Sequence, residues 1–117
     1  MAESTNPDEV PPAPSTAPSM EQAMRRLRID EDLQEDVQDA IPQAKAEAEA
    51  FLDGKLYADA QAREDALDPR GIVCTPDIIA AQLLLIDAIV HSNTDEGAEV
   101  KRTRAFGMLR RHRNQGV

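Results

Sequence analysis

The 117-residue sequence has little of what small proteins use to hold a compact fold. It contains one cysteine, no tryptophan, one tyrosine and two phenylalanines. A single cysteine excludes an intramolecular disulfide, and a domain of this size with so few aromatic side chains has a modest core. We therefore expect a marginally stable subunit that gains stability by associating with copies of itself.

Long apolar runs are also missing. The longest, residues 78–90, contains Gln82 and Asp87 and falls short of the roughly twenty apolar residues that span a bilayer. The first residues do not combine a basic start with an apolar stretch, so the sequence predicts no signal peptide. We expect no membrane partner and synthesis in a reducing cytoplasm, where a lone cysteine stays free.

The sequence contains no set of residues with a recognisable chemistry. It has neither a Gly-rich phosphate loop nor the Cys and His spacing of a metal site. The carboxylates of residues 30–39 fail the calcium-loop pattern, which requires Gly and Glu where this chain has Glu35 and Ile41. Cys74 lies in an apolar stretch and fits a buried small side chain better than a nucleophile. We expect no enzyme activity, no catalytic residue, no cofactor and no metal.

The two histidines also have structural interpretations. Asp87 and His91 are four residues apart on one face of a predicted helix, where they can pair. Such a pair orients a general base in some enzymes, but no nucleophile motif accompanies it here. We interpret it as a structural ion pair or capping contact. His112, flanked by Arg111 and Arg113, is expected on a basic surface.

The formal net charge of -9 is unevenly distributed along the chain. Residues 30–68 are strongly acidic, whereas residues 101–113 carry six Lys or Arg and no acid. An acidic surface argues against general nucleic-acid binding, and the asymmetry favours head-to-tail association or docking of the basic end on an acidic partner. The predicted partner-docking residues are Lys101, Arg102, Arg104, Phe106, Leu109, Arg110, Arg111 and Arg113.

The N-terminal region is predicted to be a disordered arm followed by a short helix. Residues 1–19 are rich in proline and serine, so ordering them would cost entropy with little burial in return. Ser19 and Gln22 then form a capping-box pattern that begins a helix over residues 20–28.

A long amphipathic helix follows. Its apolar residues recur at steps of three and four, and acids crowd its first turns, where the helix dipole favours them. We expect Asp30 or Asp32 to cap its start, a kink just before Pro42, and a stop at Asp53 and Gly54. The apolar stripe is Leu33, Val37, Ile41, Ala44, Ala48 and Phe51.

A third helix is predicted over residues 76–91. Thr75 is its N-cap and Pro76 takes the first position, where the missing N–H is not needed. Nearly every position is apolar, and the helix carries two apolar stripes, of which we assign one to contacts between subunits. The predicted inter-subunit packing residues are Ile78, Leu85 and Ile89.

The remaining segments carry weaker patterns. Residues 57–67 fit a short helix, residues 68–71 a turn and residues 72–74 an extended segment. After a loop over residues 92–97, a final helix has weak periodic support. The predicted fold is all-α, a small helical bundle of about four helices with a long kinked helix. Residues 20–117 form one domain, ending in a basic C-terminal segment, residues 101–117.

The order of these pieces resembles the head-tail connector (adaptor) proteins of long-tailed bacteriophages. The resemblance covers roughly residues 20–117 and rests on order and spacing, not on an invariant chemical signature. The arm lies outside it, and the closing segment departs from the family pattern at Arg111 and His112. The segments that carry it are 27–30 (L-R-I-D), 56–59 (L-Y-A-D), the turn 68–71, 71–76 (G-I-V-C-T-P), the apolar helix 78–90 and the closing 109–113 (L-R-R-H-R).

The resemblance implies a structural role in the neck of a virion. Members of the family form a ring, here expected to be dodecameric, between the portal protein and a tail-side neck or stopper protein. DNA passes through the lumen without sequence-specific binding, and the protein is made in the cytoplasm of a bacterial host. The alternative is a DNA-binding or packaging-associated regulator that uses the basic C-terminal helix, which would show salt-sensitive affinity for duplex DNA.

Overall fold

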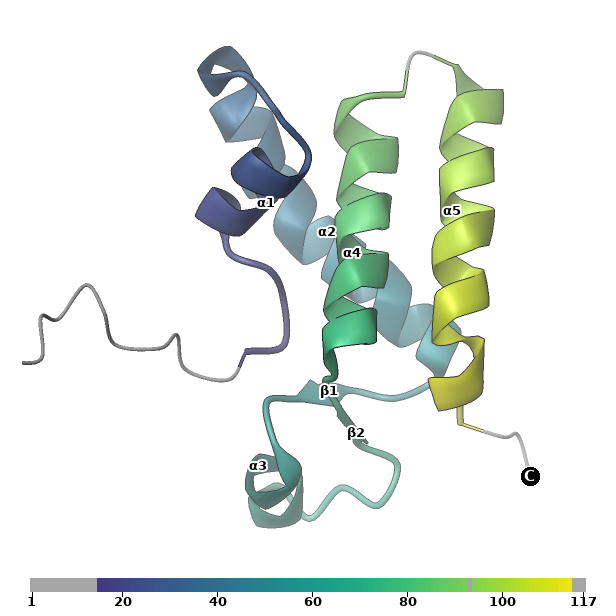
Figure 1. Ribbon diagram of the computed structural model, residues 1–117. Helices are drawn as coiled ribbons and strands as arrows, with labels where there is room; N and C mark the ends of the chain where they lie inside the picture. The colour runs from purple at the N-terminus through teal and green to yellow at the C-terminus, as the bar shows by residue number, and fades with distance from the viewer. Residues whose placement is uncertain (1–14, 93, 115–117) are drawn as a thin grey trace, which may run out of the picture.

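The computed structural model describes residues 15–92 and 94–114, which form a helical bundle with one small sheet (Figure 1). Five α-helices lie in this part of the chain, so the all-α class is confirmed with one helix more than the four or so predicted. The elements are α1 (Met20–Arg26), η2 (Glu31–Leu33), α2 (Gln34–Leu52), β1 (Leu56–Tyr57), α3 (Ala60–Asp65), β2 (Ile72–Val73), α4 (Pro76–Val90), α5 (Asp95–Leu109) and η3 (Arg110–His112).

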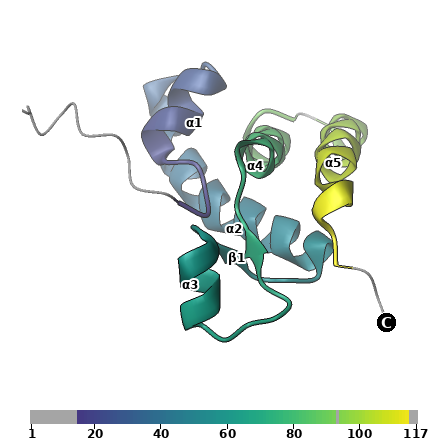
Figure 2. The same ribbon diagram turned by 60° about the horizontal axis from the view of Figure 1, so that its bottom comes forward.

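The apolar helix α4 lies at the centre of the bundle. It runs side by side with α5, has α1 on its other side, and is crossed on one face by α2 (Figures 1 and 2). The lobe made of β1, α3 and β2 projects from the end of the bundle where α4 begins (Figure 2). No helix in the described part of the chain is long and apolar enough to span a bilayer.

Helix α2 is a single element that continues through Pro42, and a 3₁₀ turn precedes it. Neither Asp30 nor Asp32 caps it: Asp30 is the N-cap of the 3₁₀ turn but makes no side-chain cap bond. Its buried stripe is rotated from the predicted one, because alanines let α4 approach closely. Leu33, Ile41 and Phe51 are only half-buried. The buried residues of α2 are Val37, Ala40, Ala44, Ala48 and Leu52.

The predicted stop of α2 at Asp53 and Gly54 is confirmed. Asp53, not Gly54, takes the left-handed conformation, with φ of 56°. Gly54 is required by crowding, because a Cβ there would lie 2.6 Å from the Arg70 carbonyl oxygen and 2.6 Å from Asn114 Nδ2. The glycine therefore lets three distant parts of the chain meet at the end of α2.

The lobe contains a strand that the sequence analysis missed. β1 and β2 pair in parallel, with Leu56 opposite Ile72, and α3 forms the crossover between them. The predicted turn is present, since the Gly71 N–H donates to the Asp68 carbonyl oxygen at 3.1 Å. The Tyr57 hydroxyl donates to Asp68 Oδ2 at 2.9 Å, which ties the strand to the turn.

Helix α4 begins where predicted, with Thr75 at the N-cap and Pro76 in its first turn, but two of the residues assigned to contacts between subunits are buried in this chain. Thr75 occupies the N-cap position without a capping bond, because its hydroxyl donates to the Asp77 carboxylate instead. Ile78 and Leu85, assigned to contacts between subunits, are fully buried within this chain. Neither side chain can therefore offer surface to a second copy, whereas Ile89 is half-buried.

The last residues of the predicted arm belong to the folded domain. Gln82 in α4 is fully buried, and its Nε2 donates to the Thr16 carbonyl oxygen at 2.8 Å. Pro18 is buried, and Ser19 caps α1 by accepting a bond from the Gln22 N–H at 3.0 Å. Residues 15–18 form a strap against α4, whereas residues 1–14 of the predicted arm lie outside the described residues.

Candidate interaction surfaces

Arg102 is the most firmly held of the predicted docking residues. Its Nε donates to Glu47 Oε1 at 2.8 Å and its Nη2 to Glu47 Oε2 at 3.1 Å, which joins α5 to α2 in a two-point contact. The hydrogen bonds to Glu47 raise the pKa of the guanidinium. The sequence analysis expected the basic segment to meet an acidic partner outside the subunit, whereas here α2 of the same chain supplies the acid for Arg102.

Lys101 joins α5 to α4. Its Nζ lies 3.2 Å from Asp87 Oδ2, and His91 Nδ1 lies 2.7 Å from Asp87 Oδ1. The predicted pairing of Asp87 with His91 is confirmed, and the lysine completes a group of three side chains. These charges tie the last turn of α4 to the helix that follows it.

Arg111 and His112 both contact Asp77, at the start of α4. Arg111 Nη2 lies 2.8 Å, and His112 Nε2 2.7 Å, from Asp77 Oδ2, while Thr75 bonds the other carboxylate oxygen. Burial alone would raise the pKa of the Asp77 carboxyl, but the hydrogen bonds from these three side chains outweigh it and hold that pKa well below its usual range. His112, expected on a basic surface, lies between the exposed Arg111 and Arg113, but its side chain is four-fifths covered and its ring contacts Asp77.

The apolar members of the predicted docking set pack inside the chain. Leu109 is fully buried. The Phe106 ring stacks on Phe51 of α2 with centroids 4.7 Å apart, and the Arg113 guanidinium lies 5.2 Å from the centroid of the Phe51 ring. An aromatic stack capped by a cation thus holds the end of α5 against α2.

Asn114 is a structural residue that the sequence analysis missed. Its backbone N–H donates to the Leu52 carbonyl oxygen at 2.9 Å. Its Nδ2 donates to the carbonyl oxygens of Asp53 and Arg70, both at 2.8 Å. These contacts bridge 44 to 62 residues of sequence, and no local sequence pattern around the asparagine predicts them.

Two of the predicted docking residues remain accessible to a partner. Arg104 and Arg110 are exposed and make no ion pair with any residue between 15 and 114 that the structure describes. Arg104 lies on the exposed face of α5 with Val100, Thr103 and Gly107 at helical spacing, and Arg110 follows just past the end of the helix. The acids Glu96 and Glu99 are exposed on the same face, which we name the outer face of α5. Val100 is 56% exposed, and a Cβ on Gly107 would meet nothing within 4 Å.

The opposite side of the molecule carries acids. Figures 1 and 2 place α1 and the start of α2 on one side of α4 and α5 on the other. We name the acids at this start the acidic edge; all are exposed, and none forms an ion pair with another described residue. The acidic edge consists of Glu31, Asp32, Glu35, Asp36 and Asp39.

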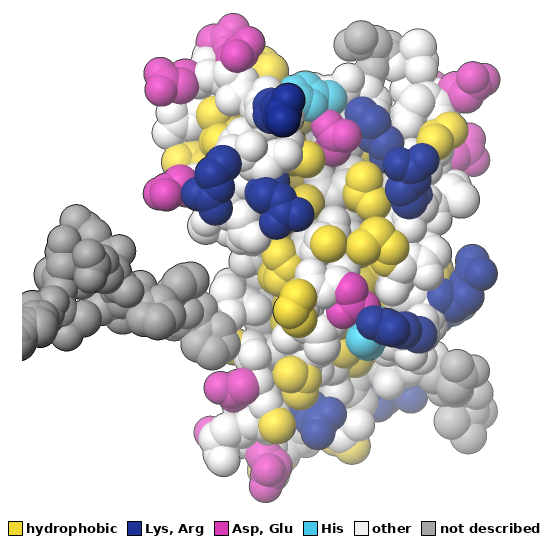
Figure 3. All heavy atoms as spheres, in the orientation of Figure 1, with side chains coloured by type: hydrophobic (Ala, Val, Ile, Leu, Met, Phe, Trp, Pro, Cys, Tyr) yellow, Lys and Arg dark blue, Asp and Glu magenta, His cyan; other side chains and the backbone are white. Residues whose placement is uncertain are grey.

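A second basic group, which the sequence analysis overlooked, lies at the end of α1. Figure 3 shows Lys and Arg side chains over α1 and over α5, with hydrophobic side chains over α4 between them. Arg25, Arg26 and Arg28 are exposed, and among the described residues only Arg25 approaches an acid, Glu21, at 3.9 Å. The signal was present in the sequence as R-R-L-R.

Few side chains in the described residues are suited to metal binding or catalysis. No set of three or more Asp, Glu, His or Cys side chains suited to a metal ion occurs within residues 15–92 and 94–114. Burial raises the pKa of the Cys74 thiol to about 11, so the thiolate that would act as a nucleophile is disfavoured at neutral pH.

No protein-family model matches the chain, and comparisons with curated proteins and with solved structures find no significant match.

Proposed function

We propose that the chain is a structural subunit of the head-tail connector type, which packs head-to-tail into a ring in the neck of a phage or phage-like particle. The support begins with the order of sequence segments that resembles this family. The helical fold is compatible with it, since two helices, a small crossover lobe and two further helices follow one another in the order of those segments. The portal on one side and a stopper protein on the other are the proposed neighbours.

The observation that carries the proposal is that a group of exposed acids and the exposed Arg104 and Arg110, none of them in an ion pair with a described residue, lie on opposite sides of the molecule. The acidic edge lies on the α1 side, and the outer face of α5, with Arg104 and Arg110, lies on the other (Figure 1). A surface that complements a different surface of the next copy gives a heterologous contact, and such contacts close into rings when the rotation permits. Charge complementarity sets the orientation of the copies.

The outer face of α5 also offers apolar contact. Exposed Val100 can be buried by a neighbour, and the open space over Gly107 permits close approach of another chain. Individual exposed ion pairs contribute only about 0–1 kcal/mol, so burial at Val100 and several charge pairs must act together.

Charge-reversing substitutions on the two sides of the molecule test the proposal. We expect Asp36→Lys with Asp39→Lys, or Arg104→Glu with Arg110→Glu, to reduce incorporation into portal-containing particles, measured by co-sedimentation. A chain that carries all four changes should recover incorporation, because every copy then presents the reversed charges to its neighbour. The matched control is Glu64→Lys, an exposed reversal on α3, which should leave incorporation unchanged.

Two results would contradict the proposal. Full incorporation of both charge-reversed variants would show that these sides do not meet. Tight, salt-sensitive binding of duplex DNA by the unmodified protein would favour the regulator instead. Fewer basic side chains are available to bind DNA than the sequence suggests, because Lys101, Arg102 and Arg111 are paired with acids of their own chain.

A further inference from the structure

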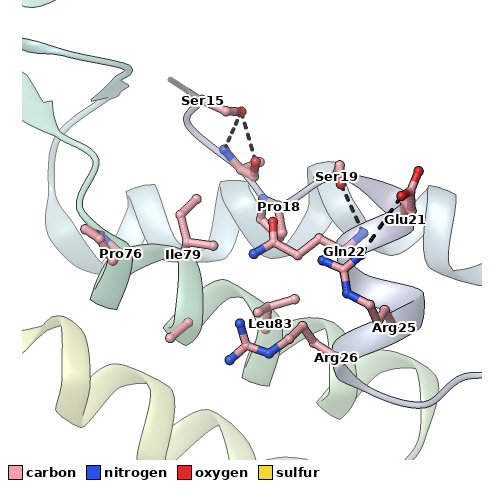
Figure 4. A pocket seen from close by; sticks show the side chains of 12 residues that line it. Ser15, Pro18, Ser19, Glu21, Gln22, Arg25, Arg26, Pro76, Ile79 and Leu83 are labelled. Carbon is pink, nitrogen blue, oxygen red and sulfur yellow. Dashed lines mark hydrogen bonds and ion pairs between the residues drawn. The ribbon is translucent and has the colours of Figure 1, made fainter. Parts of the chain in front are cut away.

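A groove runs between α1 and the first half of α4, with a volume of about 1000 Å³ (Figure 4). One wall is α1, the other is α4, and the strap closes one side. A smaller hollow of about 180 Å³ adjoins the groove, since both are lined by Ala80 and Leu83, and it reaches Leu84. Together they follow α4 from Pro76 to Leu84, a rise of about 12 Å at 1.5 Å per residue.

The α4 wall of the groove is apolar and incompletely covered. Figure 4 shows Ile79 and Leu83 on this wall. Ile79, Ala80 and Leu84 are partly exposed, so apolar side chains of an occupant would be buried against them. Ile79 and Leu83 are about one helical turn apart, and apolar side chains with that spacing pack well against the i and i+4 side chains of an amphipathic helix.

The α1 wall of the groove is basic. Arg25 and Arg26 are exposed there, and the one acid among the described lining residues is Glu21, 3.9 Å from Arg25. The lining therefore carries two positive charges against one negative charge. Although the formal net charge of the chain is -9, salt screens the distant acids, so the nearby arginines favour an acidic occupant.

We infer that this groove binds an acidic amphipathic helix of a partner protein, with its apolar stripe on α4 and its carboxylates beside Arg25 and Arg26. The lengths agree, because two turns of a helix rise about 11 Å at 5.4 Å per turn. Apolar burial on α4 supplies most of the affinity, and the two arginines fix the orientation of the helix and speed its association.

The described residues of a second copy fit the groove less well than such a helix. The acids of the acidic edge belong to a segment whose apolar residues, such as Val37, pack into the core of their own subunit. The exposed large apolar side chains of the described residues are Leu67 and Val100, which lie apart, one after α3 and the other within α5. Neither belongs to an apolar stripe that could cover α4.

The inference goes beyond the proposed ring and does not depend on it. Within the described residues, the lining of the groove includes no member of the acidic edge and neither Arg104 nor Arg110. Charge reversals that test the ring therefore leave the groove intact, and substitutions in the groove leave the two sides of the ring contact intact.

Methyl NMR titration of the full-length chain, labelled at Ile, Leu and Val, tests the inference. The probe is a synthetic peptide of Glu, Leu and Ala, with leucines at i, i+4 and i+7 and glutamates on the adjoining faces. We expect saturable shifts of the Ile79 and Leu83 methyl resonances. The same peptide with Gln in place of Glu should bind about tenfold more weakly at low salt. A peptide of the original composition in a rearranged order, without the stripe, should cause no saturable shift.

Substitutions in the protein separate the two walls. Arg25→Gln with Arg26→Gln should weaken binding of the probe about tenfold and remove most of its salt dependence. The matched control is Arg104→Gln with Arg110→Gln, the same loss of charge outside the groove, which should leave the affinity unchanged. Ala80→Gln should abolish binding, because its longer side chain fills the groove, while circular dichroism shows whether the chain stays folded. If it does not, Ile79→Ala replaces it and should weaken binding.

Four results would overturn the inference. The first is no saturable shift with the probe, and the second is equal binding of the rearranged peptide, which would show attraction by charge alone. Equal shifts with a short DNA duplex would favour a nucleic acid as the occupant. Contacts of Ile79 and Leu83 that the probe does not displace, detected as NOEs within the chain or between differently labelled copies, would show that the groove is already filled.

Discussion

Gly54 and Gly107 differ in the space that their surroundings leave for an added methyl group. A Cβ at Gly54 would meet a backbone carbonyl oxygen and the Asn114 side chain at 2.6 Å, whereas a Cβ at Gly107 would point into open space. The first site is fixed by atoms that cannot all move aside. The second lies in the exposed middle of a helix, where glycine has an entropic disadvantage against alanine.

We therefore predict opposite effects of the same substitution. Gly54→Ala should lower the free energy of unfolding by about 1–3 kcal/mol, because the crowded end of α2 must shift. Gly107→Ala should raise it by about 0.5–1 kcal/mol. Urea unfolding followed by circular dichroism measures both. Equal effects at the two sites would show that crowding at Gly54 is relieved without cost.

Asp77 makes the stability of the folded chain depend on pH in the acidic range. Its pKa is lower in the folded chain than in the unfolded one, so the folded form binds fewer protons. The stabilisation is therefore complete above the unfolded pKa of about 4 and is lost as the pH falls below it. We predict that Asp77→Asn flattens the fall in stability between about pH 5 and pH 2.

The control for that measurement is Asp32→Asn, at an exposed acid with no ion pair among the described residues. Thermal unfolding of the three proteins across this range compares the slopes. A slope for Asp77→Asn that equals the slope for the unmodified chain would contradict a stabilising role of the contacts with Arg111 and His112.

At the scale of elements, charge ties α5 to its neighbours. Arg102 makes a two-point contact with Glu47, and both side chains are about a third exposed or less. We predict a coupling free energy of about 1 kcal/mol in a double-mutant cycle of Arg102→Ala and Glu47→Ala, weaker at high salt. The Arg25 and Glu21 pair, 3.9 Å apart and exposed, is the control and should give about 0–0.5 kcal/mol. Equal coupling in both pairs would count against the role of geometry.

Several elements could be predicted from the sequence because their signals are local. Ser19 and Gln22 mark the start of α1, and Thr75 with Pro76 marks the start of α4. β1 could not be predicted, because it has two residues and its partner strand lies beyond α3. The start of α5 was placed too late, since Thr94 caps it by accepting from the Gly97 N–H at 3.0 Å.

The candidate surfaces were less predictable, for a physical reason. The composition of the basic segment is plain in the sequence, but whether each charge is free depends on acids far away along the chain. Arg102 finds Glu47 and Arg111 finds Asp77, over separations of 55 and 34 residues. A helical pattern also fails to tell which apolar face is covered by which neighbour, as Ile78 and Leu85 show.

At the scale of the whole molecule, the C-terminal segment is part of the core. We predict that deletion of residues 101–117 unfolds the subunit. Loss of a buried leucine such as Leu109 costs about 2–5 kcal/mol by itself, against a total stability of about 5–15 kcal/mol for a typical domain. Circular dichroism of the truncated chain is the measurement. A cooperative, helical truncated chain would contradict the prediction, and full-length Arg104→Ser with Arg110→Ser should stay folded.

The position of Asn114 also bears on synthesis. The end of α2 is closed only when this residue reaches the carbonyl oxygens of Leu52 and Asp53, and Leu109 fills the core just before it. A chain still attached to the ribosome cannot complete that closure until Asn114 itself has left the exit tunnel. A product that lacks Leu109 and Asn114 would leave apolar side chains near the end of α2 uncovered, and exposed apolar surface is recognised by chaperones and proteases.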